Sequence, residues 1–236
     1  MKQNYLKTSL SPYVILKARD AKRKLKLSLC LLLMVATSWS IKATETPKVQ
    51  PWQAKGLKQE VETKRTRNSK HFDIGNNKTT SFMSVGSIHF KNANNTWEEI
   101  NNQIITNTQA NSNLYPLASE KNAIKTYFPS NPFNGNVLMV SKEASFKEKI
   151  SAIKFLDASK NVISTLPISN QVSYSVNDSK VSYLGFHPGL NLSYSLGNDS
   201  RKFDLEITST SFLNVIPANA VYLSIEETFS VDKAAR

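Results

Sequence analysis

Cysteine is almost absent from this chain of 236 residues. The only one, Cys30, lies in an apolar run near the N-terminus, and Leu29 before it is too large for a lipoprotein processing site. Because no thiol follows residue 43, the rest of the chain can form neither a disulfide nor a thiolate metal site. Its fold therefore depends on a hydrophobic core. This pattern fits an exported bacterial protein better than a small eukaryotic secreted domain.

The chain also lacks an apolar run long enough to cross a membrane. Residues 27–40 (LSLCLLLMVATSWS) number fourteen, and a membrane-spanning helix needs roughly 20. A basic stretch precedes this run and small residues follow it, which is the organisation of a secretory signal peptide. We therefore expect residues 1–43 to be a signal peptide, cleaved after Ser40 or Ala43, with no membrane span in the processed chain. Because the basic segment before the apolar run is unusually long for a signal peptide, an uncleaved signal anchor is the alternative.

Acidic residues are few: 18 Asp and Glu stand against 30 Lys and Arg, which gives a net charge of +12. Nine of the basic residues and one of the acidic residues lie within residues 1–44, so the remainder carries 21 basic and 17 acidic residues, a net charge of +4. A net charge this small, spread along the chain, does not indicate a surface that binds a polyanion. The densest basic stretch of the remainder, residues 63–71, is interpreted as a solvated segment. No nucleic-acid partner is expected.

After residue 44, apolar residues do not recur at helical spacing. The dominant pattern is instead the alternation of apolar and polar residues. It predicts strands with one buried face at 171–176, 190–196, 202–208 and 220–227, and weaker strands at 80–91, 97–106, 122–128, 135–141 and 151–156. Segments rich in Asn, Asp and Gly separate the strands at 133–136, 157–161, 176–180 and 196–200. Short strands joined by turns predict an all-β fold, an antiparallel β-sandwich-like structure after the signal peptide.

The expected organisation has four parts. The signal peptide, 1–43, precedes a linker or irregular arm at 44–68, a small N-terminal β region at 69–108 and a main β-sandwich-like region at 120–230. The polar stretch TNTQANSN, 106–113, is the best internal boundary. It either separates two domains or is a long loop within one.

Residues 181–207 (VSYLGFHPGLNLSYSLGNDSRKFDLEI) combine a histidine with serines and acids, which raises the question of catalysis. Pro188 and Gly189 fit the central positions of a type II turn. We therefore interpret the polar groups here, namely His187, Asn191, Asn198 and Asp199, as turn residues or outward-facing strand residues.

The sequence contains one candidate catalytic triad and one candidate metal site. A triad of His187, Ser193 and Asp204 is disfavoured because Ser193 sits in a regular strand rather than on a strained elbow. A metal site of His71, His89 and His187 is disfavoured because their spacing matches no ligand pattern. No catalytic, cofactor-binding or metal-binding residue is assigned, and no cofactor is expected.

The paired carboxylates are also disfavoured as a catalytic site. Glu98–Glu99 and Glu226–Glu227 are neighbours in strands, so the two acids of each pair face opposite ways. There is no phosphate loop and no dinucleotide fingerprint. A carbohydrate-binding platform requires that the fold gather Trp52, Trp97 and the tyrosines on one surface. Such residues more often pack in a core or at an edge.

Two blocks of sequence, residues 64–104 and 177–207, resemble the N-terminal region of large exported bacterial RHS/YD-repeat proteins, including wall-associated types and proteins with DNRLRE-type domains. The segment VIPANAVYLSIEE follows the second block. The matching positions are Arg67, Ser69, Lys70, Phe72, Ile88, His89, Phe90, Trp97 and Ile100 in the first, and Tyr183, Pro188, Gly189, Leu190, Leu192, Tyr194 and Lys202 in the second. Asn191 replaces the usual Asp, and Asp199-Ser200 stands where Gly is common. No Tyr-Asp repeat dipeptide occurs.

The resemblance implies a β-rich, non-enzymatic module with a structural or interaction role, secreted or held at the bacterial cell surface. Its expected partner is a following C-terminal segment or another surface protein. A secreted carbohydrate-binding module is the alternative, with a glycan as its ligand, and a small secreted hydrolase is a less favoured one.

Overall fold

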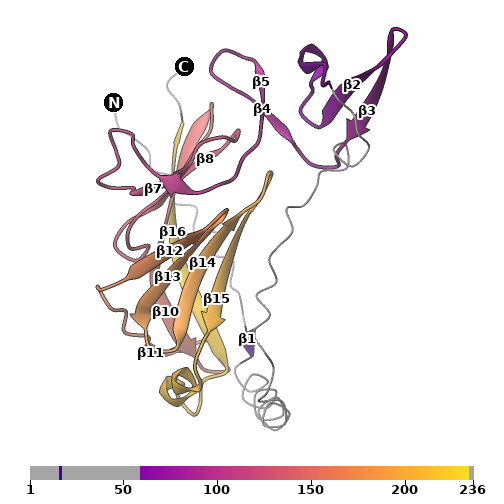
Figure 1. The fold of residues 1–236 in the computed structure, drawn as a ribbon. Helices are drawn as coiled ribbons and strands as arrows, with labels where there is room; N and C mark the ends of the chain where they lie inside the picture. The colour runs from indigo at the N-terminus through magenta and orange to yellow at the C-terminus, as the bar shows by residue number, and fades with distance from the viewer. Residues whose placement is uncertain (1–15, 18–58, 234–236) are drawn as a thin grey trace, which may run out of the picture.

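The computed structural model describes residues 16–17 and 59–233 (Figure 1). These residues form antiparallel strands arranged as two facing sheets and two small hairpins, so the predicted all-β fold is confirmed. Helical structure is limited to two short 3₁₀ segments, η1 (Glu62–Lys64) and η2 (Thr210–Val215). Within the described ranges no helix is long and apolar enough to cross a membrane. The predicted signal peptide, apart from residues 16–17, and positions 44–58 of the predicted arm lie outside the described residues.

The larger sheet has eight strands. Its path runs β1-β16-β10-β9-β8-β7-β6, and β11 pairs separately with the far end of β10. The strands are β1 (Leu16–Lys17), β6 (Ile105–Thr106), β7 (Leu117–Ser119), β8 (Lys125–Phe128), β9 (Val137–Val140), β10 (Ala144–Leu156), β11 (Val162–Thr165) and β16 (Tyr222–Lys233).

The long strands β10 and β16 form the backbone of this sheet and pair along their whole lengths. A bulge shifts the register: Ile150 is opposite Glu227, but Ala152 is opposite Glu226. Because of the extra residue, Ile150 and Ile153 both point into the core, although they are three positions apart, and each is at most 1% exposed. The simple alternation on which strand prediction depends is broken here. The sequence accordingly predicted only 151–156 of β10.

The smaller sheet has four strands in sequence order, β12 (Ser173–Asn177), β13 (Lys180–His187), β14 (Leu190–Leu196) and β15 (Arg201–Ile207). Gly189 has φ +80°, as expected of a type II turn after Pro188. A second glycine of positive φ, Gly185 at +79°, lies where the pairing of β13 with β14 is interrupted. The predicted strand 190–196 agrees with β14, whereas β13 was not predicted.

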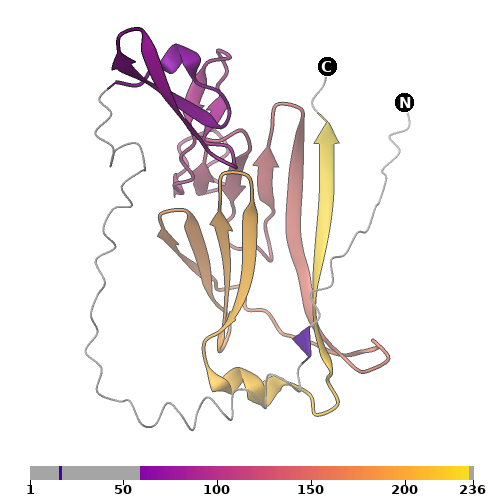
Figure 2. The same cartoon turned by 90° about the vertical axis from the view of Figure 1, so that its right-hand side faces the viewer.

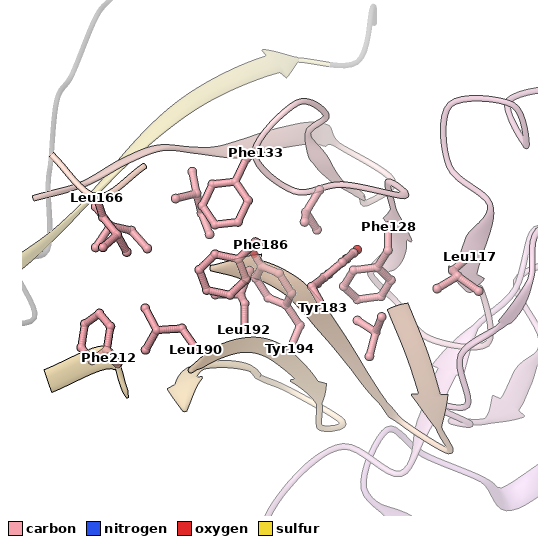
Figure 3. Close-up of a cluster of buried hydrophobic side chains, with 14 of the residues drawn as sticks. Leu117, Phe128, Phe133, Leu166, Tyr183, Phe186, Leu190, Leu192, Tyr194 and Phe212 are labelled. Atoms are coloured by element: carbon pink, nitrogen blue, oxygen red, sulfur yellow. The ribbon is translucent and has the colours of Figure 1, made fainter. Parts of the chain in front are cut away.

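The main core lies between the two sheets and contains side chains from both (Figure 3). Phe128 of the larger sheet packs against Tyr194 of the smaller one with ring centroids 5.8 Å apart, and Phe133 packs against Phe186 at 5.0 Å. Phe212 of η2 lies at one end of the core, 6.2 Å from Phe155. Such aromatic contacts contribute about 0.5–1.5 kcal/mol each beyond the burial of their area. The two sheets are therefore held together as a β-sandwich without any disulfide.

The N-terminal hairpins, β2 (Ser69–Gly75) with β3 (Lys78–Met83) and β4 (His89–Lys91) with β5 (Trp97–Glu99), lie beyond one end of the sandwich (Figure 2). Residues 59–68, predicted as part of an irregular arm, are bonded to β2 through bridges such as Glu60 with Phe72. An ion-pair cluster ties these segments together, because Arg65 contacts Glu60 at 2.7 Å and Lys70 contacts Glu99. Strand β6, which falls within the predicted region 69–108, belongs to the larger sheet.

Candidate functional site

The residues of the considered triad are not brought together. His187 is 6% exposed, lies opposite Leu190 on the core-facing side, and packs edge-on against Phe212 at 5.8 Å. Its Nδ1–H donates to the Pro188 carbonyl at 2.8 Å. Placing His187 on an exposed turn was therefore wrong, because the ring is needed to fill the space beside Phe212. Ser193 lies opposite Asp204, on the other face of β14 from Leu190.

Each of the histidines considered for a metal site contacts other partners. His71 contacts the hydroxyl groups of Ser69 and Ser81, and the Nδ1–H of His89 donates to the Thr66 carbonyl at 2.7 Å. Burial lowers the pKa of His89. Within residues 59–233, no group of three or more His, Cys, Asp or Glu side chains is placed to hold a metal ion.

Each considered pair of neighbouring glutamates points to opposite sides of its strand. Glu98 accepts a hydrogen bond from Asn92, whereas Glu99 accepts one from Lys70. Glu226 is bound by the Lys154 ammonium at 2.6 Å. Its neighbour Glu227 lies on the face of β16 shared with the core residue Ile150 of β10.

A different carboxylate pair, which the sequence analysis missed, lies at one end of the sandwich. This end, called the open end below, carries the β14–β15 turn, and β10 and β16 run past it (Figure 2). Glu148 of β10 is 2% exposed and forms an ion pair with Arg201 of β15. The Arg201 guanidinium lies 4.8 Å from the ring centroid of Tyr194. Burial raises the pKa of Glu227 on β16, and the nearby negative charge of Glu148 raises it further.

The ion pair leaves two buried polar atoms unsatisfied. Among the described residues neither Glu148 Oε1 nor Arg201 Nη1 has a hydrogen-bond partner. A buried unpaired group of this kind costs about 1–3 kcal/mol, and more when it is charged. The Glu148–Arg201 pair is therefore a costly feature of the core rather than a simple stabilising contact.

A pocket of about 270 Å³ opens next to Arg201. Its wall comes from the β14–β15 turn, the ends of β7, β8 and β9, and two segments that precede the sandwich. The lining residues are Arg67, Asn102, Ser119, Asn122, Ala123, Ile124, Thr126, Met139 and residues 196–201. Ser119 is 2% exposed, and its hydroxyl has no hydrogen-bond partner among the described residues.

The β14–β15 turn connects the sandwich to the N-terminal hairpins. Asp199 accepts hydrogen bonds from the Ser87 backbone N–H at 2.7 Å and from Arg67 at 3.2 Å. The Asn198 side chain donates to the Ser87 carbonyl at 2.7 Å. Hydrogen bonds from Ser87 lower the pKa of Asp199 below its usual value. These two residues are indeed on a turn, but they bind a distant segment instead of only facing solvent.

Beyond the pocket, the inner face of the larger sheet carries exposed apolar side chains. Phe146, Phe229 and Val231 are 41%, 46% and 55% exposed and form what is called the apolar strip below. Val231 is opposite Phe146, and Phe146 is opposite the pocket residue Met139. The strip therefore continues the row of side chains that borders the pocket. The strip residues lie toward the Ala144 end of β10 and the Lys233 end of β16. These strand ends extend past the smaller sheet (Figure 2).

Within the described part of the chain, the tryptophan and tyrosine residues considered for a carbohydrate platform lie in different elements. Trp97 is in β5 with the Lys91 ammonium 5.2 Å from its ring centroid, and Trp52 lies outside the described residues. Tyr183 and Tyr194 belong to the core. Tyr174 is 39% exposed at the β12 edge of the smaller sheet.

Comparison of the chain with protein-family models, with curated proteins and with solved structures found no match.

Proposed function

We propose that this chain is an exported, non-enzymatic β-sandwich module with a structural or interaction role, placed as in the N-terminal part of RHS-like bacterial surface proteins. The resemblance of residues 64–104 and 177–207 to that region supports the placement. The module acts by pairing the edge of β16 with an extended strand, either from a C-terminal segment of the same polypeptide or from another surface protein.

The observation that carries this proposal is the edge of β16. One side of the strand pairs with β10 along its whole length, but on the other side only Tyr222 and Leu223 are paired, with β1. Among the described residues, no strand covers positions 224–233 on that side. A long edge of this kind is a template for strand addition, because its N–H and C=O groups point outward.

The edge also defines the chemistry of its partner. Strand β1 pairs antiparallel with β16, so this edge accepts an antiparallel strand. A strand added beside Phe229 and Val231 buries them best with apolar side chains at alternate positions on that face. Removal of a signal peptide comprising residues 1–43 takes β1 away and extends the free edge to Tyr222.

The placement of the polar groups supports a binding role over a hydrolytic one. Glu148 and Arg201 are engaged with each other, and His187 and Ser193 lie on opposite faces of the smaller sheet. None of the four forms the nucleophile–base contact that a hydrolase of this type needs.

Light scattering on purified residues 44–236 tests the proposal, because a free edge pairs with a second copy when no natural partner is present. We expect the mean mass to rise with protein concentration. Phe229→Lys is expected to keep the protein monomeric by placing a charge on the apolar strip. Ser230→Lys is the matched control, since Ser230 is exposed on the opposite face of β16. A monomer at every concentration, or equal effects of the two variants, contradicts the proposal.

A further inference from the structure

We infer that the strand added to the β16 edge carries a lysine or arginine opposite Glu227, with apolar residues at the neighbouring inward positions. The inference rests on the proposed strand addition at this edge. It specifies the chemistry of the partner, which the free edge alone does not.

The inward row of side chains on β16 is apolar except at one position. Ile225, Phe229 and Val231 lie on the inner face of the larger sheet. Glu227 belongs to the same row, because its partner Ile150 points into the core and is 1% exposed. A strand added beside β16 places its own inward side chains roughly 4.5–5.5 Å, Cβ to Cβ, from those of this row. The added strand therefore meets one carboxylate between apolar side chains.

That carboxylate has no partner of its own in the described part of the chain. Glu227 forms neither a hydrogen bond nor an ion pair there, since Arg201 is paired with Glu148 and Lys154 is paired with Glu226 on the outer face. Burial raises the pKa of Glu227, the charge of Glu148 raises it further, and Arg201 offsets only part of the increase. A second cation beside Glu227 therefore stabilises its charged form.

The Glu227 side chain can be reached from the free edge. It is half-buried rather than enclosed, and no described strand covers it on the side of β16 away from β10. Glu148 Oε1 and Arg201 Nη1 differ in this respect, because both atoms are closed off from solvent. A side chain of an added strand can therefore contact Glu227 without opening the core.

Glu227 also discriminates among strands. An apolar residue opposite it buries the carboxylate without a partner, and an acidic residue adds repulsion between like charges. An inward-pointing charge on an edge strand is a known device against unselective pairing. Because the added strand is antiparallel, it meets Val231 first and Ile225 last. From its N-terminus it therefore carries two apolar residues, one basic residue and one apolar residue at alternate positions.

Fluorescence anisotropy with labelled synthetic peptides and the full chain tests the inference. The peptides alternate valine and threonine over the span from Val231 to Ile225 and differ only opposite Glu227, where they carry lysine, glutamine or glutamate. We expect affinity to fall in that order, by roughly 2- to 5-fold at each step. Glu227→Gln is expected to bind the lysine and glutamine peptides equally, because the charge that distinguishes them is gone.

Glu226→Gln is the matched control, since Glu226 is bound by Lys154 on the outer face, and it is expected to keep the preference for lysine. Equal affinity for the three peptides, or an equal loss of preference in both variants, overturns the inference but leaves strand addition intact. Absence of binding by every peptide contradicts strand addition as well. The lysine peptide is also expected to reduce self-association in light scattering. Binding without this effect places the peptide away from the β16 edge and overturns the inference.

Discussion

His187 illustrates how a polar residue next to a turn can belong to the core. Its ring packs edge-on against Phe212, and only 6% of the residue is exposed. We expect His187→Ala to lower the free energy of unfolding by about 1–3 kcal/mol, because it leaves a cavity and removes the hydrogen bond to Pro188. Denaturant unfolding measures the change. Lys142→Ala, in an exposed turn, serves as the control and is expected to stay within about 0.5 kcal/mol.

Glu227 is expected to make stability depend on pH. Its pKa is raised in the folded protein, chiefly by burial, so ionisation costs folding free energy. This cost is absent below the unfolded pKa, near 4.5, and increases as the pH rises toward and through the folded pKa. We therefore expect Glu227→Gln to raise the Tm near neutral pH and to give no such gain below about pH 4.

Thermal unfolding of the variant and the unchanged protein over this pH range measures the difference. Glu226→Gln is the matched control, because Glu226 is bound by Lys154 on the other side of the strand. An equal gain for Glu227→Gln at low and neutral pH contradicts the assignment.

At the scale of elements, the β14–β15 turn is the main polar connection between the sandwich and the segment before β4. Asp199 binds Ser87 through both its backbone N–H and its hydroxyl group. We expect Asp199→Ala to loosen this segment while the sandwich stays folded, and limited proteolysis to cut within residues 84–104 faster than in the unchanged protein. Asp204→Ala, a change in the neighbouring strand, is the control. Equal cleavage rates in both variants would show that Asp199 does not hold the segment.

Some strands could be predicted from sequence because nothing interrupts their alternation. Strand β14 is one, since Leu190, Leu192 and Tyr194 all face the core and are at most 1% exposed. The first half of β10 could not be predicted for two reasons. The buried residue Glu148 lies between Lys147 and Lys149, so the segment looks like an exposed charged run. The bulge then shifts the two-residue alternation of inward and outward side chains. The alternation of apolar and polar residues also predicted a buried face for β12. This strand instead forms an edge of the smaller sheet and is exposed at every position.

The proximity of the candidate site residues could not be predicted from the sequence, for a related reason. Glu148, Arg201 and Glu227 come from three different strands, β10, β15 and β16, and no spacing rule relates them. Their proximity follows from the pairing of β10 with β16 and from the facing of the two sheets. The pattern did identify the polar β14–β15 turn, but it could not show that Asn198 and Asp199 bind Ser87.

At the scale of the whole molecule, the proposed removal of a signal peptide determines which part of the β16 edge is free. The basic leader and the apolar run at 27–40 predict removal of residues 1 to about 43. Mass spectrometry of the exported protein is expected to place its N-terminus at Ile41 or Thr44. An intact Met1 on a membrane-bound protein would contradict signal cleavage and support the anchor instead.

Amide hydrogen exchange of residues 44–236 at low and high protein concentration tests the central claim most directly, because it locates the surface through which the module associates. We predict that peptides covering 224–233 of β16 become more protected as concentration rises, while peptides covering β12, the edge of the smaller sheet, do not change. Unchanged protection of β16 at all concentrations, or a gain in β12 instead, would contradict strand addition at the β16 edge.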